Sequence, residues 1–251
     1  MSSAPSAAAA APSTGGMSQT DVVVQGIKDM LTSGTLGPGS RLPVEKDLAT
    51  SLGVSRGSLR EGVRALCIMG VLETRQGDGT YVTSLDSTLL LAPMGFMVDL
   101  QSPEHRQDLH TVRRVLESEA AARAALYIST EQLTEAARVL ATVEPLVLRT
   151  ERRDHEAIME ADIAFHHLVA AGSHNAALAA LIDAFASRTH RARLWVGLHN
   201  QGQVSASHAD HVNILAAIRA RNPDRARLLM AHHLLVMEDY VQDQPGSDFD
   251  Q

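Results

Sequence analysis

The segment from residue 36 to residue 82 reads LGPGSRLPVEKDLA (36–49), LGVSRGSLREGVRAL (52–66) and GVLETRQGDGTYV (70–82). Apolar side chains at helical spacing, before and within it, predict three short helices. Glycine-rich turns at 34–39 and Gly53 separate them, and Pro43 suits the first turn of the second. Ser55 occupies the N-cap position of the third helix, which extends to about Met69. Helix, glycine turn and helix form the helix-turn-helix layout.

The third predicted helix carries Arg56 and Arg60 four residues apart, so both project from one face near its N-terminus. A recognition helix meets base edges and phosphates at this end. Arginine can donate two parallel hydrogen bonds to guanine, worth about 1 to 3 kcal/mol of discrimination. Taken alone, the pair also fits a solvated charged face.

After Gly70 the pattern changes to short alternating segments, 71–75 and 80–83, around a Gln-Gly-Asp-Gly turn at 76–79. A two-stranded hairpin after a helix-turn-helix is a wing, and its glycines let the backbone approach phosphates or the minor groove. The order of three helices and a hairpin is a more specific indication of a DNA-binding domain than the arginine pair.

These motifs resemble the winged helix of the GntR family of bacterial regulators, over about residues 20–83. The family pattern of Pro-Gly-x-x-Leu-Pro, Leu-Ala, Val-Ser-Arg, Arg-Glu and Gly-x-Gly-Thr is matched nearly throughout. Val44 departs from the usual capping Ser, and Gly57 stands where Thr is frequent, so one cap and one phosphate contact are in doubt. The resemblance implies that five residues contact DNA: Lys46, Ser55, Arg56, Arg60 and Gly77.

The composition predicts a mainly α protein, because 45% of the residues are hydrophobic but only 3% are aromatic. A single cysteine, Cys67, excludes a disulfide framework and suggests a reducing, cytoplasmic location. No run approaches the roughly 18 apolar residues of a membrane span, so no membrane partner is expected. The Ala-, Ser- and Pro-rich start has no Lys or Arg, which favours a disordered tail at 1–19 over a secretion signal.

Charge divides the chain into two parts. From Asp21 to Thr83, seven basic residues balance seven acidic ones, whereas the net charge of -7 belongs wholly to the remainder. All 12 histidines lie from His105 onward. We therefore expect a winged helix-turn-helix domain at 20–83, a linker at 84–104, a helical domain at 105–241 and a disordered tail at 242–251.

Beyond Asp108 almost every stretch has a helical period, which predicts an antiparallel helical bundle. The expected helices cover 108–127, 130–149, 153–171, 175–198, 204–221 and 224–240.

Four polar side chains lie on the apolar faces of these helices: Asp162, His166, His211 and His233. Burying such groups without partners costs several kcal/mol, so they either satisfy one another or bind something. A hydrogen-bonded network is one reading. One carboxylate and three imidazoles also fit a divalent transition metal, with a coordination position left for a ligand. Zinc is favoured, with nickel and manganese as alternatives.

The motifs DIAFH, SHNAAL, DHVNILAAI and ARLLMAHHL are similar to the FCD ligand-binding domain of the FadR subfamily, over about residues 105–240. In metal-binding members, the positions that match this quartet are the ligands. Some members lack the metal and bind acyl thioesters instead, and the intact quartet argues against that mode. The sequence LHTVRRVLE places Arg113 at the family's pocket position, where it suits a carboxylate effector. A structural salt bridge to Glu117 is an equal alternative.

Together these features predict a homodimer that represses a metabolic operon by binding a palindromic operator. A small carboxylate effector, such as a sugar acid or a hydroxy acid, is expected to bind at the metal and release the DNA. One alternative is a regulator that senses the metal itself. Another is a metal-dependent hydrolytic enzyme, although no clear general base accompanies the quartet.

Overall fold

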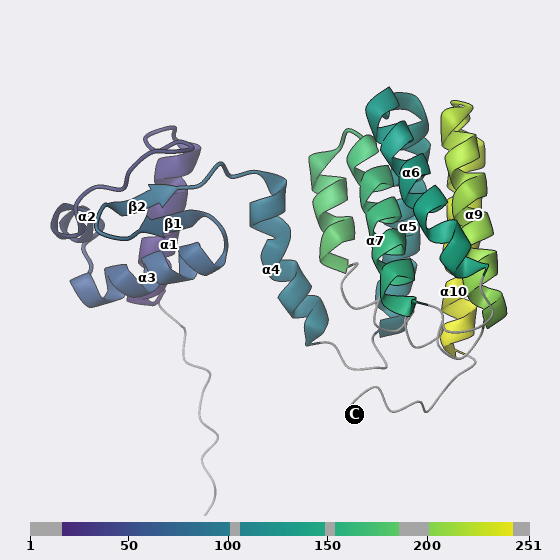
Figure 1. Cartoon of the computed structure of the whole chain (residues 1–251). Coiled ribbons are helices and arrows are strands. Elements are labelled where there is room, and N and C mark those ends of the chain that lie inside the picture. Colours follow the sequence, from purple (N-terminus) through teal and green to yellow (C-terminus); the bar gives the residue numbers. More distant parts are fainter. Residues whose placement is uncertain (1–16, 101–105, 149–153, 186–200, 243–251) are drawn as a thin grey trace, which may run out of the picture. The chain divides into compact units, whose positions relative to one another are not determined.

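The computed structural model describes residues 17–100, 106–148, 154–185 and 201–242. It divides into two compact units, Met1–Ser84 and Leu85–Gln251, which are described separately (Figure 1). The expected tails at 1–19 and 242–251 lie mostly outside the described residues.

The first unit holds three helices and a hairpin: α1 (Gln19–Thr32), α2 (Glu45–Leu52), α3 (Arg56–Ile68), β1 (Leu72–Arg75) and β2 (Gly79–Val82). Ser18 caps α1 in a capping box with Asp21. Pro43 lies just before α2 rather than in its first turn, and Val44 at the N-cap makes no side-chain hydrogen bond. The cap that the sequence left in doubt is therefore missing.

The core of the first unit lies between the helices and the hairpin. The strands pair antiparallel with Leu72 opposite Val82, and both side chains are buried. Residues 39–42 run along the other edge of β2, where Leu42 N–H donates to the Thr80 carbonyl at 2.8 Å. The wing is thus tied to the turn that precedes α2.

The stretch 84–104, for which the sequence predicts a linker, contains helix α4 (Ser87–Asp99). Asp86 caps it by accepting a hydrogen bond from Leu89 N–H at 3.0 Å. Pro93 lies inside the helix.

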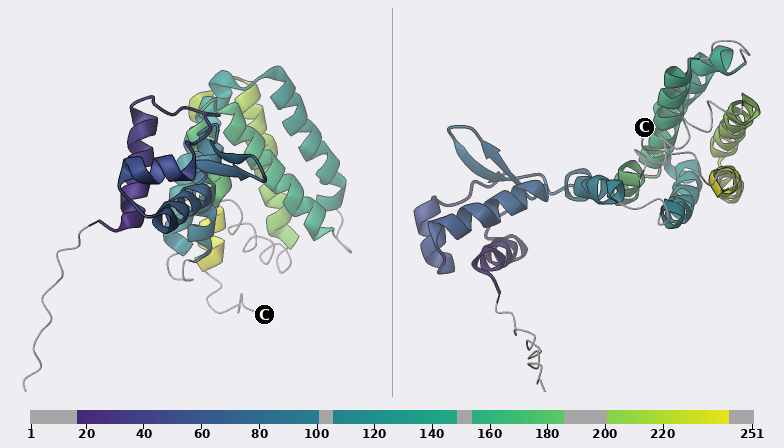
Figure 2. Two further views of the ribbon diagram at one scale, coloured as in Figure 1. Left: turned by 90° about the vertical axis from the view of Figure 1, so that its left-hand side faces the viewer. Right: turned by 90° about the horizontal axis from the view of Figure 1, so that it is seen from below.

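The second unit also contains a bundle (Figures 1 and 2) made of α5 (Arg106–Tyr127), α6 (Thr130–Val147), α7 (His155–Gly172), α9 (Gln201–Arg219) and α10 (Pro223–Gln242). Helix α5 packs against α7, α9 and α10, and α6 packs against α7 and α9. Residues 176–185 are also helical, and the rest of the predicted helix 175–198 lies outside the described residues. A three-residue turn joins α9 to α10, which makes these two packed helices antiparallel.

Small side chains let the bundle helices approach closely. Ala121, Ala124 and Ala125 of α5 are fully buried against α9 and α10 residues such as Ile218 and Met230. Where the structure describes the chain, no helix is long and apolar enough to cross a membrane.

Candidate functional sites

Three helices of the second unit bring three histidines together in its interior. Helix α7 contributes His166, α9 contributes His211 and α10 contributes His233, each at most 3% exposed. The neighbouring His167 and His232 point outward, as their places on the helical faces predict. The ring of Phe165 stacks on His211 with centroids 4.6 Å apart, which fixes the orientation of that imidazole.

The donor atoms of this cluster converge. His211 Nε2 lies 3.2 Å from His233 Nε2, and Asp162 Oδ1 lies 3.5 Å from His211 Nε2 and 3.9 Å from His166 Nε2. The three histidines each offer a nitrogen within 4.8 Å of the others. Two ligands about 2.1 Å from one ion at near-tetrahedral or octahedral angles are roughly 3.0 to 3.4 Å apart. The arrangement therefore fits a single divalent ion when the more widely separated donor atoms move closer together.

Carboxylates stand behind two of the histidines. Glu117 contacts Nδ1 of His166, and Asp210 Oδ2 lies 3.4 Å from Nδ1 of His233. A carboxylate on one ring nitrogen fixes the tautomer, so that the other nitrogen presents its lone pair to the cluster. This pattern is typical of metal-binding histidines.

Arg113, which the sequence predicts at the effector pocket, pairs with Glu117. Its Nε donates a hydrogen bond to Glu117, and both side chains are almost completely buried. Arg113 is not among the residues that line the neighbouring pocket. The geometry therefore matches the salt bridge that the sequence left as one of two roles, and it links Arg113 to His166 through Glu117.

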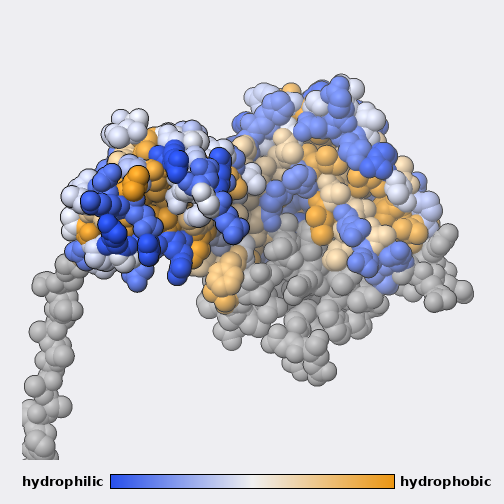
Figure 3. All heavy atoms as spheres, turned by 60° about the vertical axis from the view of Figure 1, so that its left-hand side comes forward, coloured by the Kyte–Doolittle hydropathy of each residue, from blue (hydrophilic) through white to orange (hydrophobic). Residues whose placement is uncertain are grey.

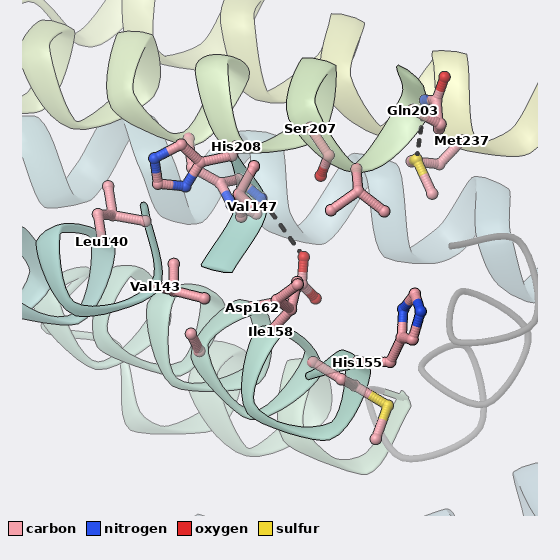
Figure 4. Close-up of a pocket in the computed structure, with 14 residues that line it drawn as sticks. Leu140, Val143, Val147, His155, Ile158, Asp162, Gln203, Ser207, His208 and Met237 are labelled. Carbon is pink, nitrogen blue, oxygen red and sulfur yellow. Dashed lines mark hydrogen bonds and ion pairs between the residues drawn. The ribbon is translucent and has the colours of Figure 1, made fainter. Parts of the chain in front are cut away.

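A pocket with a cavity volume of about 80 Å³ opens beside the cluster. Asp162 points into it (Figure 4), and His211 also lines it. Four polar lining residues are not among the site residues predicted from the sequence: His155, Gln203, Ser207 and His208. Helical spacing could have indicated part of this lining. His155 lies two turns before Asp162 on the same face of α7, and Val204 lies two turns before His211 on the same face of α9.

His208 has an altered titration. Burial lowers the pKa of its imidazole below the ordinary 6.5, although the Glu144 carboxylate opposes this shift. The ring is therefore mainly neutral near pH 7 and able to both donate and accept a hydrogen bond.

In the first unit, the side chains of Lys46, Arg56 and Arg60 are exposed. The Arg60 guanidinium donates to both oxygens of Glu45 at 2.9 to 3.1 Å. This hydrogen bond lowers the pKa of Glu45, so the carboxylate is ionised wherever the pair forms. This exposed pair connects the first turn of α2 to the second turn of α3.

Ser55 is confirmed as the N-cap of α3, because its Oγ accepts a hydrogen bond from Ser58 N–H at 3.0 Å. The hydroxyl cap leaves the next backbone N–H groups at the helix N-terminus, a position that favours anions such as phosphates. Ser55 thus has a local structural role besides the DNA contact that the sequence predicts.

The wing tip is a glycine turn. Gly77 has φ of +75°, a conformation that favours glycine, and Asp78 N–H donates to the Arg75 carbonyl at 3.1 Å. The Arg75 guanidinium lies over the Tyr81 ring, 4.2 Å from its centroid. Figure 3 shows mostly hydrophilic residues, with smaller hydrophobic areas, on the visible face of this unit.

Comparisons with known families cover both units. The family described as bacterial regulatory proteins, gntR family, matches residues 19–82. The FCD domain matches residues 108–235.

Curated relatives are similar over most of their length. The HTH-type transcriptional regulator LutR of Bacillus subtilis (strain 168) is 30% identical over 84% of this chain and 96% of its own. The Uxu operon transcriptional regulator of Escherichia coli (strain K12) is 29% identical over 83% of this chain and 80% of its own. A putative L-lactate dehydrogenase operon regulatory protein of the same strain is 28% identical, covering 90% and 88%.

A solved structure described as Streptococcus agalactiae GntR is also similar. It has a TM-score of 0.62 and 28% identity, covering 88% of this chain and 99% of that one.

Proposed function

The chain belongs to the GntR family of bacterial regulators and carries an FCD domain, and from this we propose that it is a homodimeric, cytoplasmic repressor of a metabolic operon. A small carboxylate, such as a sugar acid or a hydroxy acid, releases it from a palindromic operator. The matched families and relatives are transcription regulators, so the chain is a regulator and not an enzyme. The convergence of His166, His211 and His233 beside an open pocket carries the ligand-responsive part of the proposal.

DNA recognition in this proposal depends on the N-terminal end of α3 and on the wing. Arg56 and Arg60 reach base edges or phosphates, and Lys46 and Ser55 contact phosphates. Gly77 lets the wing backbone approach the duplex closely. Two copies of the chain read the two halves of a palindrome.

Replacing both arginines tests this assignment. Arg56→Ala with Arg60→Ala should weaken operator binding at least about 100-fold, since each contact is worth about 1 to 3 kcal/mol. Effector binding should not change. Arg138→Ala, which removes an exposed arginine on α6, is the control. Unchanged operator affinity in a gel shift at matched salt would show that the arginines do not contact DNA.

In the second unit, the proposal assigns Asp162, His166, His211 and His233 as ligands of zinc, or of nickel or manganese. A bound ion supplies a Lewis-acid position for a carboxylate oxygen. The chain's own groups orient the ligands: Glu117 holds His166 and Asp210 holds His233. Asp162 and His211 line the pocket, so an ion that they held would be accessible to an effector carboxylate there. If Arg113 has any effect on effector binding, the salt bridge implies that it acts through Glu117 and His166.

Metal content tests the ligand assignment. His211→Ala and His233→Ala should each lower metal content and the effector response, with operator binding retained. His232→Ala, at an exposed neighbouring position, is the control. Elemental analysis that finds no metal in the purified chain, and none after addition, would contradict the assignment. Operator release on titration with metal alone would instead identify a metal-sensing regulator.

The names of relatives support regulation of a metabolic operon. One is named for an L-lactate dehydrogenase operon, another for the Uxu operon and a third is a Glc operon transcriptional activator. Because that set includes an activator, transcription assays with the chain and its operator decide between repression and activation.

A further inference from the structure

We infer that Arg64 binds a phosphate of the DNA backbone in a groove between α3 and the wing, in addition to the five DNA contacts predicted from the sequence. This inference rests on the proposed function, because it requires that the chain binds DNA through α3 and the wing. It assigns the groove to the sugar-phosphate backbone, so Arg64 contributes to affinity and not to sequence preference.

This α3–wing groove has a cavity volume of about 510 Å³ and three walls. One wall is α3, the second is the hairpin of β1 and β2, and the third is the segment 41–45 that leads into α2. Leu48 and Leu59, each 1% exposed, form its floor. Leu42 N–H donates to the Thr80 carbonyl at 2.8 Å, so two of the walls are joined by the backbone itself.

Positive charge is concentrated in the α3–wing groove. Among the described residues that line it, three are arginines, Arg41, Arg60 and Arg64, and the one acidic residue is Glu45. The segment from Asp21 to Thr83 as a whole is neutral. A cleft lined mainly by one sign of charge attracts ions of the opposite sign, so the groove favours an anionic partner.

Arg64 differs from the other two arginines in having no partner within the described part of the chain. The Arg60 guanidinium donates to Glu45, and Arg41 contacts the backbone carbonyl and the carboxylate of Asp78 at the wing tip. Arg64 is exposed, and its guanidinium makes no hydrogen bond or ion pair with any described residue. Arg64 can therefore pair with a phosphate without first breaking an internal contact.

The hairpin adds two hydroxyl groups to the same groove. Thr74 and Thr80 are cross-strand partners, so both side chains lie on one face of the hairpin, with their Oγ1 atoms 3.5 Å apart. That face is directed at α3, because Thr74 Oγ1 lies 3.8 Å from Sγ of Cys67, one helical turn beyond Arg64. Guanidinium and hydroxyl groups are both common donors to DNA phosphates.

The arrangement of a DNA duplex determines which part of it meets the α3–wing groove. In the proposed function, the N-terminal end of α3 enters the major groove of DNA and the wing approaches the adjacent minor groove. A sugar-phosphate backbone separates these two DNA grooves, so it passes between α3 and the wing. Arg64 lies about two turns beyond Arg56, the first residue of α3, and is therefore beside this backbone rather than at the base edges.

Methylphosphonate scanning of DNA tests the contact. The probe is a duplex that the full chain selects from random-sequence DNA, with each phosphate of one half-site replaced in turn by a neutral methylphosphonate. At one position the replacement should weaken binding of the unaltered chain about eightfold at about 0.1 M salt, the effect of one lost phosphate contact. Binding of Arg64→Gln should not change there, because its charge is already absent. Arg64→Lys, which keeps the charge, should remain sensitive.

Lys28→Gln is the matched control, since it removes an exposed cation of α1 outside the α3–wing groove and should keep the sensitivity of the unaltered chain at every position. Equal sensitivity of Arg64→Gln and the unaltered chain at every phosphate would overturn the inference. A changed base preference of Arg64→Gln in selection from the same DNA pool would also overturn it, because Arg64 would then contact a base. Failure of the unaltered chain to enrich any duplex would refute the proposed DNA recognition, and this inference with it.

Discussion

Two carboxylates, Glu117 and Asp210, act on the histidine cluster without belonging to it. Each faces the Nδ1 atom of a histidine whose Nε2 points at the other ligands. Glu117 has a second partner, because Arg113 is buried against it. Removing the charge of Glu117 would break its buried ion pair with Arg113, a change that destabilises proteins by about 3 to 5 kcal/mol. Asp210 is the better position for a test, since its side chain is 31% exposed.

Asp210→Asn should lower zinc affinity about 10- to 100-fold while the chain stays folded, because outer carboxylates orient the ligand and raise its basicity. The measurement is competition with a chelator of known affinity. Glu119→Gln, which alters an exposed carboxylate paired with Arg227, should leave zinc affinity unchanged. Unaltered zinc affinity in Asp210→Asn would mean that His233 needs no orienting partner. Glu117→Gln should lower both zinc affinity and stability.

The convergence of the three histidines could be predicted from the sequence, because helical spacing alone places each on a buried face. The carboxylates that contact these histidines could not be predicted in this way. Glu117 and His166 are separated by 49 positions, so their contact depends on how α5 packs against α7. The pocket lining likewise combines side chains from four helices, and no single periodic pattern contains it.

Among the elements, α1 and α3 approach each other closely at Gly62. A Cβ atom there would lie 2.5 Å from Val23 Cγ1 and 2.6 Å from its Cβ, distances that force the helices apart. Gly57 in the same helix would place a Cβ no nearer than 3.6 Å to Ser55 Oγ. The two glycines therefore differ in what the fold requires of them.

Gly62→Ala should destabilise the DNA-binding unit by about 1 to 3 kcal/mol through overpacking. Gly57→Ala should leave its stability unchanged or raise it by up to about 1 kcal/mol, because alanine favours a helix over glycine. Native-state hydrogen exchange of the α1 and α3 amides measures both effects within this unit. Equal protection of the two variants would contradict a close contact at Gly62.

Element boundaries were predictable where a capping residue marks them. Ser55 begins α3 and Ser129 begins α6, each through a side-chain hydrogen bond to the helix's first turn. Helix α4 was not predicted, because its run of apolar residues with Pro93 inside shows little helical periodicity. The wing could be predicted because a glycine-containing turn between two short alternating segments is compatible with few structures other than a hairpin.

On the scale of the whole molecule, charge is unevenly divided. The segment from Asp21 to Thr83 is neutral, and the surplus of acidic residues lies beyond it. Bulk attraction to DNA is therefore weak, and operator affinity depends on a few local cations and on the number of copies that bind. The sequence shows this division directly, whereas the number of copies depends on contacts between chains.

The salt dependence of operator affinity measures how many copies of the chain contact DNA phosphates. Each phosphate contact that is lost reduces the slope of log K against log salt by about 0.9, so Lys46→Ala should reduce it by about 2 if a homodimer uses this lysine twice. Lys28→Ala, which removes an exposed lysine of α1, should leave the slope unchanged. Operator titrations between about 50 and 200 mM salt provide the measurement. A reduction of about 1 would indicate that a single copy contacts phosphate through Lys46, and an unchanged slope would remove Lys46 from the interface.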